Sequence, residues 1–329
     1  YMDYMDDECL THFTQGQKDR IDWAIETYRP ILLENTTLDY AGPVWHVSTE
    51  GSDETGDGTE ANPYATIQKG IDSASDGDTV LVSPGVYEEK VQIRNEIFLV
   101  SQSGPAVTII DGTCPYNSCN VITSNEPLTL KINGFTITGG KAYDDSINGP
   151  GWVGGAIGIA YDGWDVDSLI LKNMIFIDNE NFDINYGWDD IYLEIKNSTF
   201  IKNEGNIFYG SGGDEFEHII SSSIFFSEQV NMQNDYVGNF INCLTYGGIS
   251  FPNLDASNSN LINVNPFFCD PGNGDYSLAE NSPCVSTVLN GDDIGALGVG
   301  CEAIEVQSLW HVATTGSDEN GDGTELNPF

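Results

Sequence analysis

Aromatic and acidic side chains recur together in the middle of the sequence. The segment Tyr161-Asp-Gly-Trp-Asp returns as Tyr186-Gly-Trp-Asp-Asp, and a further tyrosine follows at a similar interval as Tyr209. Flat rings beside carboxylates suit a sugar, because a ring packs against the C–H face and carboxylates accept hydrogen bonds from hydroxyls. The candidate ligand-binding residues are Tyr161, Trp164, Asp165, Tyr186, Trp188, Asp189, Tyr209 and Asp214. The alternative is a structural ladder of stacked rings that joins successive turns of the chain.

Two Asp- and Gly-rich turns are candidates for calcium binding. The stretch Asp318–Gly323 fits the opening D-x-N-x-D-G of an oxygen-ligand loop, whereas Asp53–Gly58 carries threonine at the third position. Neither has glutamate at the twelfth position, so neither is an EF-hand. The candidate calcium ligands are Asp53, Asp57, Asp318, Asn320 and Asp322, and solvated polar turns are the alternative.

Five short segments align with one another and indicate the element that must position these side chains. They begin at Ile132, Leu171, Ile195, Ile220 and Phe240. All intervals but the first are roughly 20 to 25 residues, a period typical of one turn of a parallel β-helix, in which neighbouring turns bury each other's apolar side. The first and longest interval contains a Gly-rich insertion, Gly139–Gly155, which we expect to form a long loop.

A longer repeat marks the domain boundaries. The stretch Trp45–Tyr64 returns as Trp310–Phe329, with fifteen of twenty positions identical. We therefore expect one complete unit over 44–308, a linker over 35–43 and a truncated second unit over 309–329. The sequence also begins within a motif, so we expect a piece of a longer protein.

The complete unit opens with a strand-like Val44–Val47 and a helical pattern over Ala65–Ala74, followed by short strands. The segments NPYATIQKGIDSASDGDTVLVSPGVY and FFCDPGNGDYSLAENSPC…DIGALGVGC resemble the first and closing parts of secreted, pectin-lyase-like β-helix proteins. The resemblance implies a mainly β, right-handed parallel β-helix whose N-terminal end is covered by the helix. It does not establish an activity, because one fold supports many functions.

Residues 1–34 resemble the end of the catalytic domain in pappalysin-like metzincin metalloproteases, through YMDYMDDECLTHFTQGQKDRI. The resemblance implies that Met2 lies in the Met-turn beneath a zinc ion, that Tyr4 stabilises the oxyanion and that Cys9 pairs with an upstream cysteine. The sequence has no HExxHxxGxxH, so the zinc ligands and the glutamate base are absent and this chain should not cleave peptides. An unrelated helical linker is the alternative.

Charge and composition restrict the partners. The 11 Lys and Arg residues against 51 Asp and Glu give a formal net charge of −40, while 40% of residues are hydrophobic. A packed domain with so acidic a surface repels nucleic acid and anionic membranes. No stretch reaches the roughly 18 apolar residues of a membrane helix. We expect a secreted or cell-surface, bacterial extracellular protein.

The seven cysteines form no CxxC pair and no zinc-finger spacing. Cys114 and Cys119 bracket a short turn, so we expect them to pair with each other. Two further disulfides are expected within the group Cys243, Cys269, Cys284 and Cys301, in one of three pairings. Disulfides of this kind are typical of an oxidising compartment.

Two functional hypotheses follow. In the first, the chain is part of a secreted, multi-domain zinc metalloprotease, and its β-helix is a non-catalytic module for substrate binding or spacing. In the second, the β-helix is itself a polysaccharide lyase, a glycoside hydrolase or a glycan-binding adhesin. Lyases of the pectin-lyase-like class use an Arg or Lys base, but Arg94 is the last arginine and the later lysines show no partner pattern. A hydrolase needs two carboxyl groups about 5 to 9.5 Å apart, and the sequence singles out no such pair.

Overall fold

The computed structural model describes residues 42–112, 119–124, 128–141, 155–159, 167–180, 182–187, 191–201, 207–210, 218–227, 238–249, 251, 253–288 and 291–304. A compact unit begins at Pro43. The metzincin-like residues 1–34, with Met2, Tyr4 and Cys9, lie outside the described residues, as does the second copy of the repeat at 310–329. The predicted domain limits, with unit 44–308 and linker 35–43, stay predictions.

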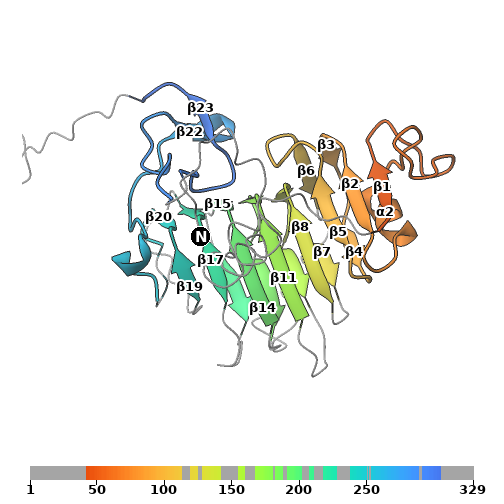
Figure 1. Cartoon of the computed structure of the whole chain (residues 1–329), viewed down its shortest axis with the longest axis horizontal. Coiled ribbons are helices and arrows are strands. Elements are labelled where there is room, and N and C mark those ends of the chain that lie inside the picture. The colour runs from red at the N-terminus through yellow and green to blue at the C-terminus, as the bar shows by residue number, and fades with distance from the viewer. Residues whose placement is uncertain are drawn as a thin grey trace, which may run out of the picture. The chain divides into compact units, whose positions relative to one another are not determined.

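The described unit is a parallel β-helix, as the sequence predicts (Figure 1). Between Thr79 and Phe226, successive strands visit three sheets in a fixed order, and neighbouring strands within each of these sheets are parallel. The eight-stranded sheet contains β1 (Val44–Val47), β2 (Thr79–Val82), β5 (Phe98–Ser101), β8 (Thr129–Asn133), β11 (Asp167–Lys172), β14 (Ile191–Lys196), β17 (Ile219–Ser221) and β19 (Asn239–Ile241). The seven-stranded sheet contains β3 (Gly85–Tyr87), β6 (Thr108–Asp111), β9 (Thr136–Thr138), β12 (Ile175–Ile177), β15 (Thr199–Ile201), β18 (Ile224–Phe226) and β20 (Leu244–Tyr246). The five-stranded sheet contains β4 (Val91–Ile93), β7 (Asn120–Ser124), β10 (Gly155–Ile159), β13 (Phe182–Gly187) and β16 (Phe208–Gly210).

The aligned segments of the sequence coincide with the register of the structure. Leu171 pairs with Ile132 on one side and Ile195 on the other, and the row continues through Ile220 to Phe240. Each of these side chains points into the main core. The predicted period is therefore confirmed, because identical positions of successive turns must stack to bury their apolar side chains.

The third position of every aligned segment forms a corner between two sheets. Its residues have positive φ angles between 48° and 87°, at Gly134, Asn173, Asn197, Ser222 and Asn242. Glycine and asparagine tolerate this left-handed conformation best, which explains four of the five choices. Each corner N–H donates to a carbonyl of the following turn, as Asn173 does to Lys196 at 3.1 Å.

The interior next to the corners is filled by a ladder of phenylalanines. The rings of Phe176, Phe200 and Phe225 stack with centroids 4.7 and 5.1 Å apart and interplanar angles of 8° and 14°. All three side chains are fully buried. The chain thus contains the kind of aromatic ladder considered above, but it is made of phenylalanines in the repeated segments.

The signature Trp45–Tyr64 folds into a turn-rich loop against β1. Trp45 stacks on Tyr64 and donates from Nε1 to Asp78, and the loop backbone bonds to the free edge of β1 through His46 N–H to Gly58 O, 2.8 Å. Gly58 has φ +77°, and a Cβ there would lie 2.6 Å from the Trp45 ring. Five positions differ in the second copy, and three of them, Glu50, Thr55 and Ala61, are exposed here, so most of the variation lies away from the packed contacts.

The helix α2 (Ile67–Ser73) follows this loop and is slightly shorter than the expected Ala65–Ala74. Thr66 is its N-cap and accepts from Lys69 N–H, while Ile67 and Ile71 join the main core. The helix contacts β1, β2 and β4 (Figure 1). Its role as a cap over the end of the β-helix stays a prediction.

The C-terminal segment folds back onto the outer face of the seven-stranded sheet. The preceding η3 (Ala256–Asn258) still belongs to the coil, because Asn258 O accepts from the corner N–H of Asn242. The segment that folds back contains η4 (Pro271–Asn273) and a small sheet of β21 (Phe268–Asp270), β22 (Asp275–Ala279) and β23 (Val299–Cys301). Side chains of this segment form a second hydrophobic cluster with outward residues of β12, β15, β18 and β20. Backbone contacts reinforce it, because Gly295 N–H donates to Ser222 O (2.8 Å) and Ala296 N–H to Thr199 Oγ1 (3.0 Å).

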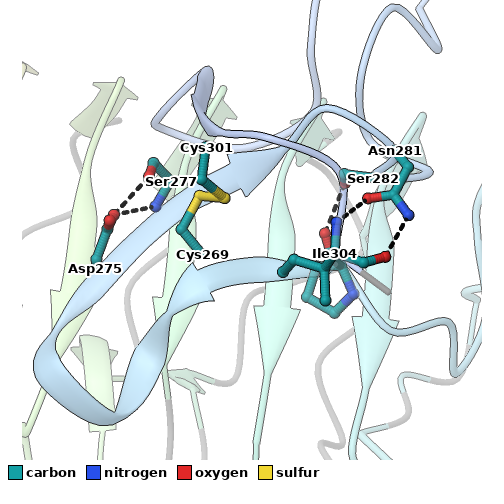
Figure 2. The surroundings of a disulfide bond; sticks show 8 residues. Cys269, Asp275, Ser277, Asn281, Ser282, Cys301 and Ile304 are labelled. Carbon is teal, nitrogen blue, oxygen red and sulfur yellow. Dashed lines mark hydrogen bonds between the residues drawn. A yellow bond between two sulfur atoms is a disulfide. The ribbon is translucent and has the colours of Figure 1, made fainter. Parts of the chain in front are cut away.

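The disulfide expectation is correct for one pair and wrong for the other. Cys269 and Cys301 are bonded and join β21 to β23 (Figure 2). Cys243 and Cys284 are buried free thiols instead. Cys243 occupies the fourth position of its aligned segment inside the main core, and Cys284 lies in the second cluster, so the two sulfurs belong to different cores. Cys119 is disulfide-bonded, and its expected partner Cys114 lies outside the described residues.

Candidate functional site

A polar groove lies over the outer face of β4, at the edge of the five-stranded sheet. The sequence Lys90-Val-Gln-Ile-Arg94 alternates polar and apolar residues, so alternate side chains point to opposite faces of the strand. Val91 and Ile93 are each 1% exposed and belong to the core. Lys90, Gln92 and Arg94 consequently share the outer face, and both cations are exposed.

The helix α2 forms one wall of the groove. Because β4 is the last strand of its sheet, one edge of its backbone needs partners from outside the sheet. The Gln68 carboxamide supplies an acceptor and a donor for this edge. Its Oε1 accepts from Gln92 N–H at 2.7 Å, and its Nε2 donates to Gln92 O at 3.1 Å. Nε2 also donates to Asp72 Oδ1, 2.9 Å away and one helical turn further on. The side chains of Gln68 and Asp72 thereby line the groove in fixed positions.

Two carboxylates hold the first turn of this helix. Glu89 accepts from Ile67 N–H (2.7 Å) and Gln68 N–H (2.9 Å). Burial raises the pKa of Glu89, and the two backbone N–H donors oppose that shift. Asp53 accepts from Ala65 N–H and from the N–H and hydroxyl of Thr66. Burial raises the pKa of Asp53, but these donors and Lys69 outweigh it, so the net pKa is lowered.

The opposite wall comes from β7 and the residue before it. Cys119, Asn120 and Thr123 line the groove, whose cavity volume is about 580 Å³. Asn120 Oδ1 is buried and accepts from no donor in the described part of the chain. The Cys119 sulfur is held in a disulfide, so it is not available as a thiolate nucleophile. The groove therefore offers amides, a hydroxyl and two cations, which are groups for binding.

The electrostatics of the groove are opposite to those of the whole chain. Lys90 and Arg94 flank β4 and both line the groove in a chain of net charge −40, and the carboxylate lining the groove is Asp72. An extended backbone places the Cα atoms of these two residues about 13 Å apart along the groove. An arginine fork binds a carboxylate with two parallel hydrogen bonds, whereas a lysine acts as a point charge.

The predicted aromatic column is wrong where the structure tests it. Tyr186 is 1% exposed, packs edge-on against His218 at 5.8 Å and belongs to the main core. Its register partner is also not Tyr209, because Tyr209 pairs with Asn185 and the register shifts after it. The spacing in the sequence did not give register, because the two tyrosines are 23 residues apart (209 − 186), whereas Asn185 and its partner Tyr209 are 24 apart (209 − 185). The remaining members, Tyr161, Trp164, Asp165, Trp188, Asp189, Asp214 and the Tyr209 side chain, lie outside what the structure describes.

The proposed calcium turn has protein donors around its acids. The oxygens of Asp53 accept the three hydrogen bonds at the start of α2, and Asp57 Oδ1 accepts from Thr59 N–H and hydroxyl. Among the described residues no group of three His, Cys, Asp or Glu side chains is placed to hold a metal ion. Asp318, Asn320 and Asp322 lie outside the described residues, so calcium binding there stays a prediction.

The groove was not predicted from the sequence. Its signal was the alternation of Lys90, Gln92 and Arg94 with buried valine and isoleucine, in a chain that has few cations. The contributions of Gln68 and Asn120 carry no such signal, because they depend on how α2 and β7 lie beside β4.

No protein-family model and no curated protein matches the sequence. Among solved structures, pectin methylesterase PemA from Erwinia chrysanthemi is similar over 83% of this chain and 72% of its own, with 15% identity and a TM-score of 0.29. A mutant pectin methylesterase in complex with a hexasaccharide covers the same shares, with 15% identity and a TM-score of 0.27. Likeness at this level carries no argument about function, and the fold rests on the strand pairing of this chain. No helix in the described ranges is long and apolar enough to cross a membrane.

Proposed function

We propose that the β-helix is an extracellular module that binds an acidic polysaccharide in the groove beside β4. The observation that carries this proposal is the placement of Lys90 and Arg94 on one outer face, in a cavity of about 580 Å³ that is otherwise lined mainly by amides and a hydroxyl. Amides and hydroxyls match sugar hydroxyls as hydrogen-bond partners, and the two cations match carboxylates along a uronate chain.

Charge selects the ligand class. The acidic surface elsewhere repels a polyanion, so a uronate chain that binds does so where cations gather. The attraction between exposed charges falls with salt, because the Debye length shortens from about 10 Å at 0.1 M to about 3 Å at 1 M. Binding at the groove is therefore expected to weaken as ionic strength rises.

The test is titration calorimetry of the whole chain with hexagalacturonate and with its fully methyl-esterified form. We expect Arg94→Ala and Lys90→Ala each to weaken hexagalacturonate binding about tenfold, as for the loss of one charge-assisted hydrogen bond. Esterification removes the carboxylate charges. The affinity of the ester for the unaltered chain should therefore be no higher than the affinity of hexagalacturonate for the Arg94→Ala and Lys90→Ala variants.

Lys131→Ala is the matched control, because it removes one positive charge from the eight-stranded sheet, where Lys131 lies over the Phe98 ring. The proposal fails if all three variants lose affinity equally, or if the ester and the acid bind alike. Release of unsaturated or reducing ends during the titration would show a lyase or a hydrolase in place of a binding module.

The metalloprotease hypothesis is compatible with this proposal. A polysaccharide-binding module could serve a protease as its substrate-binding or spacing part. The resemblance that supports the zinc enzyme rests on residues 1–34 of the sequence alone. Incubation of the chain with denatured casein and zinc should give no cleavage, and cleavage would show a metal site that the sequence does not reveal.

A further inference from the structure

A second cavity lies where the C-terminal segment meets the outer face of the seven-stranded sheet. Its volume is about 400 Å³, and aromatic residues dominate its walls. They are Phe226, Tyr246, Phe267 and Phe268, and Asn265, Pro271 and Ile304 also line the pocket. No residue that lines the groove beside β4 lines this pocket.

Two buried rings support two accessible ones. Phe226 and Tyr246 are register partners on β18 and β20, and their rings stack at 5.4 Å with an interplanar angle of 12°. Phe268 meets Phe226 edge-on at 5.2 Å. Phe226 and Phe268 are buried, whereas Tyr246 and Phe267 are partly exposed. Tyr246 and Phe267 are therefore the rings that a ligand can reach.

The backbone fixes Phe267 in an unfavourable conformation. Its φ angle is 53°, a left-handed value that bulky residues rarely adopt. Its N–H donates to Asn265 Oδ1 (2.9 Å), and its carbonyl accepts from Ala279 N–H (2.9 Å). Strained residues held in this way often occur in binding sites, where they fix a side chain before the ligand arrives.

Covalent and polar links hold the surrounding segment. The disulfide between Cys269 and Cys301 joins two of its strands, and Asn281 makes two 2.9 Å hydrogen bonds with the backbone of Ile304 (Figure 2). The pocket is thus assembled before binding, which lowers the entropy that a ligand must overcome.

The charge around the pocket excludes an acidic ligand. The sequence has no Lys or Arg after Lys202, and the exposed Asp270 and Asp275 lie in the same C-terminal segment. An anion would find no positive partner there and would meet a negative potential. Aromatic faces carry negative charge density and attract polarised C–H groups.

We propose that this pocket binds the pyranose ring of an uncharged sugar, with its C–H face against Tyr246 and Phe267. Asn265 is exposed at the rim, and its Nδ2 donates to no group among the described residues, so it is a donor for a sugar hydroxyl. The inference does not depend on the acidic-glycan groove, because it rests on other residues.

The test uses the full chain with cellohexaose, mannohexaose and xylohexaose as uncharged probes and hexagalacturonate as the acidic one. We expect at least one uncharged hexasaccharide to bind, and Tyr246→Ala and Phe267→Gly each to weaken it about tenfold, the loss of one ring stacking contact. Glycine at position 267 suits the left-handed backbone, so that variant removes the ring without adding strain.

Tyr192→Ala is the matched control, since it removes a partly exposed tyrosine from the eight-stranded sheet. Arg94→Ala should leave uncharged binding unchanged, and Tyr246→Ala should leave hexagalacturonate binding unchanged, so the two proposals fail separately. The inference is overturned if no uncharged probe binds, or if Tyr192→Ala weakens binding as much as Tyr246→Ala. It is also overturned if the chain dimerises and Phe267→Gly abolishes the dimer, because the occupant is then a second copy.

Discussion

The groove beside β4 and the aromatic pocket beside β20 lie on coils of the same kind, but the side chains that line them differ in charge and polarity. The groove uses residues between Gln68 and Thr123, which are close in sequence, and it offers cations and amides. The pocket uses residues from Phe226 to Ile304 and offers rings without any cation. The interior of the coils is alike in both places, so the difference arises on their outer faces.

One row of outward residues in the seven-stranded sheet shows that the C-terminal segment determines whether the outer face is exposed or buried. Register places six residues in line, which are Val86, Ile109, Thr136, Ile175, Thr199 and Ile224. Val86 is 53% exposed, whereas Ile175 and Ile224 are 4% and 1% exposed beneath the C-terminal segment. An apolar outward residue is thus exposed at one end of the row and buried at the other. The aromatic pocket exists because the segment folds back.

The largest effect is expected from the disulfide that holds this segment. Replacement of both Cys269 and Cys301 by serine frees a loop with a sequence separation of 32, which in the chain-entropy model costs about 3–4 kcal/mol. Uncharged-sugar binding should disappear while hexagalacturonate binding persists, because the groove shares no residue with the segment. Amide exchange at Leu278, which donates to Gly298 O, reports the opening.

Val299→Ala is the control, as an exposed residue of the same strand β23. If amide exchange at Leu278 is unchanged in the double variant, the disulfide does not hold the aromatic pocket. The groove and the pocket would then not differ in their dependence on the disulfide.

A smaller effect is expected at the groove from Gln68→Ala. The change removes the two hydrogen bonds to the Gln92 backbone and should cost about 2 kcal/mol in the free energy of unfolding. Hexagalacturonate affinity should fall with it, since Gln68 lines the groove and the Gln92 backbone loses two partners, and uncharged-sugar affinity should not. Gln102→Ala, which removes one exposed contact to Ser83, should stay within about 0.5 kcal/mol. Equal losses for both variants would contradict the role assigned to Gln68.

The smallest effect that we expect is a difference in alkylation rate between the two free thiols. Burial raises the pKa of Cys243 and of Cys284 to about 12, so each reacts only when its surroundings open. Cys284 lies in the small cluster under the C-terminal segment and Cys243 in the main core. We expect alkylation of Cys284 to be about tenfold faster, because smaller clusters open more often. Peptide mass spectrometry measures both rates, and equal labelling in denaturant is the control. Faster labelling of Cys243 would reverse the order of stability of the two regions.

The sequence predicted the coil register residue by residue. The alignment of Ile132, Leu171, Ile195, Ile220 and Phe240 is the register of the eight-stranded sheet, since a repeated apolar position reports which side chains stack. The strands Thr79–Val82 and Val91–Ile93 and the helix near Ile67 were likewise foreseeable from local pattern. The register depends on residues one period away, whereas these strands and the helix depend on residues that are close in the sequence.

The site residues were predicted less well. Tyr186 and Tyr209 are separated in the sequence by nearly one period, yet the register of β13 and β16 places Tyr209 beside Asn185, one residue before Tyr186. Cys243 and Cys284 suggested disulfides by number, but each lies in a separate core. Composition and spacing do not reveal a shifted register or which of two cores takes up a side chain.

The sequence by itself determined that this chain coils, where its corners fall and which face of each strand is buried, because those properties repeat along the chain. It also placed Lys90, Gln92 and Arg94 on one face of β4 through simple alternation. Only the tertiary structure brought Gln68 and Asn120 to the sides of that strand and placed Phe267 and Phe268 in one pocket with Phe226 and Tyr246. Such contacts join segments with no common period, and they form only when whole elements pack against one another.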